Sequence, residues 1–190
     1  MELSHYLSLR QAVIDAGFAY DITWAQNVGA PASAEVFASE FIFVVCNSGM
    51  KAQIARAIFE RVKAALLAGV DPASVFGHKG KVGAIAHVWR ERDAWFERYN
   101  AAIDKVEFLG DMPWIGPITK WHLAKNFGVN AVKPDRHLVR VADYYATTPD
   151  ELCQTLARGS GERVGTVDYV IWRACNLGLI RHDKAADAVA

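Results

Sequence analysis

Residues 108–142 read FLGDMPWIGPITKWHLAKNFGVNAVKPDRHLVRVA, and two turns interrupt the helical pattern of this stretch. The first turn, PWIG at 113–116, follows the end of one helix, and Pro117 suits the first position of the next helix. The second turn, VKP at 132–134, precedes Asp135, a residue type that commonly caps a helix N-terminus. The stretch therefore predicts a helix, a tight hairpin, a second helix, and an aspartate that opens a third.

A hairpin between two helices has a specific electrostatic consequence. It points successive backbone N–H groups, together with the positive end of a helix dipole, toward one place. Such a place suits a phosphate oxygen, with a monovalent cation such as K⁺ or Na⁺ as a candidate bridging ion. Gly116 permits close backbone approach there. The same dipole favours a negative carboxylate at Asp135.

The rest of the chain is also patterned as helices, which predicts an all-α fold. Apolar residues recur at spacings of three and four, and no segment alternates as a strand would. TPDE at 148–151 is a capping box, and Ser33 suits an N-cap. The sequence predicts helices over 3–16, 34–46, 50–67, 101–109, 117–128, 138–145 and 164–177, with an irregular connection over 18–32 and a loose segment over 69–83.

Composition excludes several classes of protein. The chain has 190 residues, 52% of them hydrophobic, and its 21 Lys and Arg balance 21 Asp and Glu. These values are typical of a globular protein rather than a disordered or histone-like one. Three cysteines without a CxxC spacing argue against a disulfide framework and an iron–sulfur cluster, and the histidines show no catalytic metal-binding pattern. No apolar run could span a membrane or form a secretory signal, so we expect a cytoplasmic protein, in the cytosol or nucleoid of a bacterial-type cell, and a monomer.

The hairpin and the aspartate together resemble a known family. MPWIG at 112–116 followed by PDRH at 134–137 is similar to the helix-hairpin-helix (HhH-GPD, endonuclease III-like) DNA glycosylase superfamily. In that family an LPGxG-type hairpin precedes an aspartate in a V-D-x-H context at the start of a helix. The resemblance implies one glycosylase-like domain over 1–190 with two helical lobes and double-stranded DNA between them. The hairpin and Asp135 would lie in a lobe over about 50–145, and the N- and C-terminal helices would form the other.

The resemblance also implies an activity and its residues. Asp135 would stabilise the cationic sugar as the glycosidic bond of a flipped-out base breaks. Members that also cut the strand carry a lysine two positions after the last hairpin glycine, where this chain has Ile118, so hydrolysis without lyase activity is expected. Trp114 stands where the family has its first hairpin glycine. The residues implied to bind DNA are Pro113, Trp114, Ile115, Gly116, Ile118 and Thr119.

Other candidate contacts have ordinary structural alternatives. Asn47 and Gln53 lie near a helix–turn–helix where relatives fill the gap left by the flipped base, although a structural turn explains them equally well. Lys79 and Lys81 could contact phosphates or belong to a solvated loop. We expect His137 to orient its neighbours rather than bind a metal ion. The candidates for an aromatic wall of the base pocket are Trp24, Trp121 and Trp172, with core packing as the alternative.

An alkylated purine is the first substrate to consider, because its positively charged base leaves with less acid assistance and suits an aromatic pocket. An oxidised purine such as 8-oxoguanine and a mismatched pyrimidine remain open. Two other classes remain as well. One is a DNA-binding helix-hairpin-helix protein without catalysis, and the other is a helical enzyme for small molecules in which the hairpin is only a corner.

Overall fold

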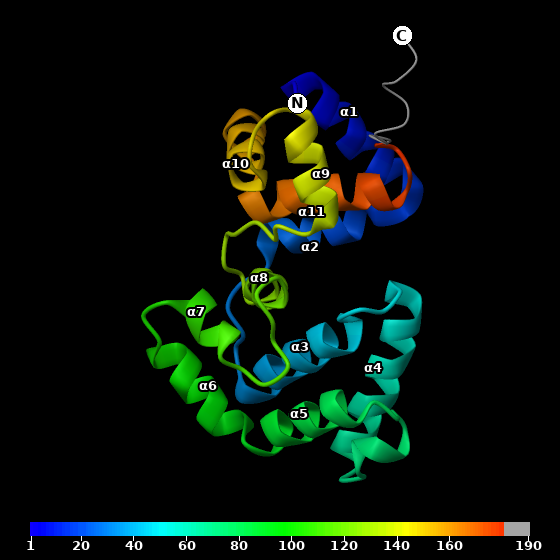
Figure 1. Ribbon diagram of the computed structural model, residues 1–190, viewed down its shortest axis with the longest axis vertical. Helices are drawn as coiled ribbons and strands as arrows, with labels where there is room; N and C mark the ends of the chain where they lie inside the picture. The colour runs from blue at the N-terminus through cyan, green and yellow to red at the C-terminus, as the bar shows by residue number, and fades with distance from the viewer. Residues whose placement is uncertain (181–190) are drawn as a thin grey trace. The chain divides into compact units, whose positions relative to one another are not determined.

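The computed structural model describes residues 1–180, and this part of the chain is built from helices without strands, which confirms the expected all-α class. The chain forms two compact units (Figure 1). We call Gly29–Phe127 the central unit, and Met1–Val28 together with Gly128–Ala190 the terminal unit. None of the described helices is both long enough and apolar enough to cross a lipid bilayer.

The unit boundaries differ from the expected lobes. The helix that follows Ser33 belongs to the central unit, and Asp135 belongs to the terminal unit rather than to the unit with the hairpin. The reason is the apolar face of helix α9 (Arg136–Tyr144), which packs against α10 and α11 of the terminal unit. Leu138 and Val141 on that face are completely buried in the terminal core.

The central unit is organised around α3 (Ala34–Asn47), whose middle and C-terminal turns are almost entirely apolar. This helix packs against four others of the same unit, so it must be apolar on several faces. The Phe37 ring stacks on Phe127, with 4.9 Å between ring centroids, and lies 5.4 Å from Tyr99. The other elements are α4 (Ala52–Leu67), the 3₁₀ turn η2 (Pro72–Ser74), α5 (Lys79–Arg90), α6 (Arg92–Ala101), α7 (Lys105–Gly110) and α8 (Thr119–Asn126).

The terminal unit is organised around α11 (Val164–Asn176), which packs against the remaining α-helices of the unit. Its core is mainly aliphatic, whereas the core of the central unit contains more aromatic rings among its aliphatic residues. The remaining elements are α1 (Leu3–Val13), the π-helical turn η1 (Ile14–Phe18), α2 (Ala19–Asn27), α9 and α10 (Pro149–Ser160).

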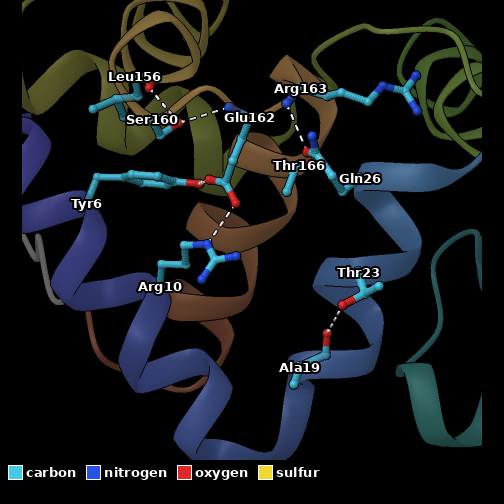
Figure 2. Close-up of polar contacts among 10 residues, drawn as sticks. All are labelled: Tyr6, Arg10, Ala19, Thr23, Gln26, Leu156, Ser160, Glu162, Arg163 and Thr166. Carbon is cyan, nitrogen blue, oxygen red and sulfur yellow. Dashed lines mark hydrogen bonds and ion pairs between the residues drawn. The ribbon is translucent and has the colours of Figure 1, made fainter.

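A partly buried polar cluster joins the first helix of this unit to the turn between its last two helices (Figure 2). The hydroxyl of Tyr6 donates a hydrogen bond to Glu162, and Arg10 Nε lies 2.7 Å from the other oxygen of that carboxylate. Burial first, and the hydrogen bond to Glu162 second, raise the pKa of Tyr6. The phenol therefore keeps its proton and donates a hydrogen bond to the Glu162 carboxylate.

Helix-start signals were predicted well. Ser33 Oγ accepts from Val36 N, and Thr148 with Glu151 forms the complete capping box. Gly128, at φ +75°, follows the end of α8 as expected.

Four local predictions were wrong. The segment 69–83 is not loose throughout, because α5 begins at Lys79. The segment 18–32 contains α2, because Gly17 at φ +95° ends one helical turn and the next helix begins two residues later. The predicted helix over 101–109 is divided, because Ala101 ends α6 and α7 begins at Lys105, after the N-cap Asp104. The helix after the hairpin begins at Thr119, so Pro117 lies in the preceding turn, although Lys120 N already donates to Gly116 O.

Candidate functional site

Asp135 is the N-cap of α9, and its carboxylate is held by the backbone of that helix. Oδ1 accepts hydrogen bonds from His137 N at 2.9 Å and from Leu138 N at 3.3 Å. The other oxygen, Oδ2, lies 3.6 Å from Lys133 Nζ, and 14% of the Asp135 side chain is exposed. The carboxylate is therefore fixed in direction, partly screened from solvent and paired with one cation.

The surroundings of Asp135 are otherwise basic. Burial first, and then the charges of Arg136, Arg140 and Lys133, lower the pKa of His137, whereas Asp135 acts in the opposite direction. Arg136 and Arg140 are exposed. One carboxylate thus stands among cations at the start of α9, an arrangement that suits a polyanion such as a nucleic-acid backbone.

Side chains and backbone of α11 and its N-cap hold the irregular segment that leads to Asp135. Arg163 Nη2 donates to Gly128 O, and Gly165 N donates to Asn130 Oδ1 at 3.2 Å. Lys133 N donates to the buried carboxylate of Asp168 at 2.5 Å. The segment before the aspartate is therefore attached to α11 and its N-cap at three points, two through its backbone and one through the Asn130 side chain, which restricts where the carboxylate can lie.

The hairpin at 113–116 forms a tight turn in the central unit. Ile115 N donates to Met112 O at 3.1 Å, and both of these side chains are buried. Within residues 1–180, the backbone N–H groups of Gly116 and Ile118 donate to no other protein group. Both remain available for an external acceptor, as a phosphate-binding turn requires.

Trp114 has a backbone conformation that glycine favours, with φ at +66°. Its ring lies on Gly80 of α5, where an added Cβ would stand 2.4 Å from Trp114 Cζ3. The ring also meets the His78 imidazole edge-on, with 5.1 Å between centroids. The hairpin is therefore anchored to the first turn of α5.

Lys81 does not meet the expectation of a phosphate contact. Its side chain is buried, and Nζ donates to Ser48 O at 2.5 Å and to Cys46 O at 3.4 Å. Lys81 thus satisfies carbonyl groups at the C-terminal end of α3. Burial lowers the pKa of Lys81, with the Cys46 thiol acting in the opposite direction. Lys79 is exposed and lines a hollow of about 460 Å³ between α5 and residues 71–77.

The remaining candidates divide between the two units. Asn47 is half-buried and donates to Phe43 O in its own helix, and Gln53 is exposed on α4. Trp121 is half-buried on α8 of the central unit. In the terminal unit, Trp24 is 39% exposed, and Trp172 packs against the core.

Glu40 is an unusual carboxyl group that the sequence did not single out. It accepts a hydrogen bond from Asn126 Nδ2 of α8 at 3.0 Å. Burial raises the pKa of Glu40, opposed by this hydrogen bond and by the charge of Lys63. Its position between the buried Ser39 and Phe41 in the middle of α3 was a usable signal, because a charged residue there needs a buried partner.

Within the described part of the chain, no group of three or more His, Cys, Asp and Glu side chains is placed to bind a metal ion. Comparisons with protein-family models, with curated proteins and with solved structures gave no match.

Proposed function

We propose that the protein is a monofunctional DNA glycosylase that hydrolyses the N-glycosidic bond of a damaged base in base-excision repair. The observation that carries the proposal is the Asp135 carboxylate, held by two backbone N–H groups at the start of α9 among exposed basic side chains. The turn at 113–116, with the available N–H groups of Gly116 and of Ile118 two residues further on, supports double-stranded DNA as the partner. K⁺ or Na⁺ at this turn, a monomeric state and a cytoplasmic location belong to the same proposal.

The proposed chemistry needs a fixed negative charge. When the glycosidic bond breaks, positive charge develops on the deoxyribose, and a nearby carboxylate stabilises it. The same group orients the attacking water and accepts a proton from it. In Asp135 the oxygen Oδ1 is occupied by backbone donors, which leaves Oδ2, beside Lys133 Nζ, as the atom for this role.

Hydrolysis rather than strand cleavage is proposed because a suitable amine is missing at the relevant position. Ile118 stands where lyase members carry their lysine, and its aliphatic side chain is 41% exposed. Lys120 is the nearest lysine along the helix, and its Nζ is paired with Glu107 at 2.8 Å. The product would therefore be an intact abasic site.

The test is a panel of duplex oligonucleotides, each with one lesion, treated with the protein and then with mild alkali. Alkylated purines come first in the panel, followed by 8-oxoguanine and mismatched pyrimidines. We expect excision of at least one lesion, and a loss of about 100-fold or more in Asp135→Asn. Asparagine caps helices as well as aspartate does, so this variant should fold normally.

The matched control is Asp104→Asn. Asp104 is the N-cap of α7 and accepts from Val106 N and Glu107 N, so it has the same local geometry as Asp135. We expect this variant to keep full excision activity. If no lesion is excised although the duplex binds with a clear salt dependence, the protein is a non-catalytic DNA-binding protein. A Schiff base trapped by borohydride would contradict the monofunctional route.

A further inference from the structure

Trp114 combines two properties that a packing role does not explain. Its φ of +66° is a conformation that costs free energy for any residue except glycine. Of the six tryptophans it is also the most exposed, at 45%. A strained position would normally be filled by glycine, and a tryptophan kept only for packing would normally be buried.

The surroundings of the ring fix its position. Three atoms of its six-membered ring, Cζ3, Cη2 and Cε3, lie over Gly80, and the imidazole of His78 stands at 78° to it. Because Gly80 has no side chain, the ring lies directly on the helix backbone. One part of the indole is thus clamped and the remainder is presented to solvent in a set orientation.

Polar groups near the hairpin and Gly80 in the sequence indicate what the ring can meet. Lys79 precedes Gly80 on α5 and is exposed, and the free N–H groups are those of Gly116, which ends the hairpin, and of Ile118, two residues after it. A cation and backbone donors suit a phosphate, and the group next to a phosphate in a DNA strand is a deoxyribose with apolar C–H faces.

We propose that the exposed part of Trp114 packs against a deoxyribose in the strand whose phosphate the hairpin holds. This inference rests on the DNA binding in the proposed function, but not on catalysis. With tryptophan at this position, the DNA strand cannot come as close to the hairpin backbone as glycine would allow. The ring provides an apolar contact with the strand instead. Such a contact releases no counterions, so its contribution to affinity does not depend on salt.

The experiment measures duplex affinity by fluorescence anisotropy at four salt concentrations for the wild type, W114G, W114F and Lys79→Ala. Glycine adopts a φ of +66° freely, so W114G should fold, and a thermal melt of each variant checks this. We expect W114G to bind about tenfold more weakly than the wild type with an unchanged slope against log salt. We expect W114F to stay within about threefold of the wild type, because it keeps an aromatic face.

Lys79→Ala is the matched control for a phosphate contact, and its slope against log salt should fall by about one. The proposal is overturned if W114G binds as tightly as the wild type or more tightly, or if its weaker binding is accompanied by a lower slope. If the wild type itself shows no salt-dependent duplex affinity, the proposed function fails, which is a distinguishable result.

Discussion

The two segments expected to contact DNA are held in place by different kinds of interaction. The segment before Asp135 is fixed by directional hydrogen bonds from α11 and its N-cap, through Arg163, Gly165 and Asp168. The hairpin is fixed by shape, with the Trp114 ring lying on Gly80. Hydrogen bonds specify a backbone position closely, whereas ring packing specifies mainly which volume is filled. Under the proposed function, the Asp135 carboxylate needs an exact position beside the reacting sugar. The hairpin needs only to stay against a DNA strand whose backbone is flexible.

The largest expected effect comes from removing the Asp168 carboxylate, which accepts a hydrogen bond from the backbone just before Asp135. Asp168→Ala leaves Lys133 N–H without the carboxylate in a buried place, and we expect the free energy of unfolding to fall by about 2–3 kcal/mol. Urea denaturation measures this change. Asp168→Asn, which keeps an acceptor oxygen, should lose less. Equal stability of Asp168→Ala and the wild type would show that this hydrogen bond does not hold the segment.

The second prediction concerns the guanidinium of Arg163, which donates hydrogen bonds to Val28 O and Gly128 O. These two residues are the ones at which the chain leaves the terminal unit and re-enters it. In Arg163→Ala we expect a loss of about 1–2 kcal/mol and faster amide exchange at residues 29–33 and 128–132. The control is Arg158→Ala, because Arg158 is exposed and its guanidinium donates to Thr155 one helical turn away in the same helix. Similar amide exchange in the two variants would show that Arg163 does not hold Val28 and Gly128 in place.

The third effect tests the shape contact in the hairpin. In Gly80→Ala the new Cβ would lie 2.4 Å from Trp114 Cζ3, so we expect a net loss of about 1 kcal/mol. The same change in a W114G background should cost nothing, which a double-mutant cycle measures. Gly83→Ala on the same helix meets no atom within 4 Å and should stabilise by about 0.5–1 kcal/mol. Additive effects in the cycle would disprove the contact.

The smallest effect concerns Glu40 in the central unit. Burial raises the pKa of Glu40, so the folded state favours the neutral carboxyl and ionisation of this group lowers the free energy of unfolding. The wild type is therefore expected to lose stability relative to Glu40→Gln as the pH rises from the unfolded value near 4.3 through the higher folded pKa. At pH 7 we expect Glu40→Gln to be more stable by less than about 1 kcal/mol, and the difference to vanish below about pH 4. Urea denaturation at pH 7 and below about pH 4 measures the difference. A lower free energy of unfolding of Glu40→Gln than of the wild type at pH 7 would contradict the prediction.

Local features were predicted from the sequence because their causes are local. The caps Ser33, Thr148 and Asp135 each satisfy N–H groups within three residues, so a short motif is enough to identify them. Gly128 likewise ends its helix through its own backbone conformation.

The unit boundary and the role of Lys81 could not be predicted in this way. The placement of Asp135 in the terminal unit follows from the packing of α9 on α10 and α11, whose residues lie further along the chain. The acceptors of Lys81 are carbonyl groups of residues 33 and 35 positions earlier, so a pattern of neighbouring lysines and glycines gave the wrong reading. The seat of the Trp114 ring is Gly80, 34 positions earlier, so a pattern of neighbouring residues could not predict this contact.

The terminal unit is assembled from the two ends of the chain, and this imposes an order on its biosynthesis. A ribosome releases α1 and α2 first, yet their partner α11 emerges only after the whole of Gly29–Phe127 has been translated. The central unit can therefore complete its core on the nascent chain before α1 and α2 have α11 to pack against. The contact between Tyr6 and Glu162 spans 156 positions, so it can close only after Glu162 has been synthesised.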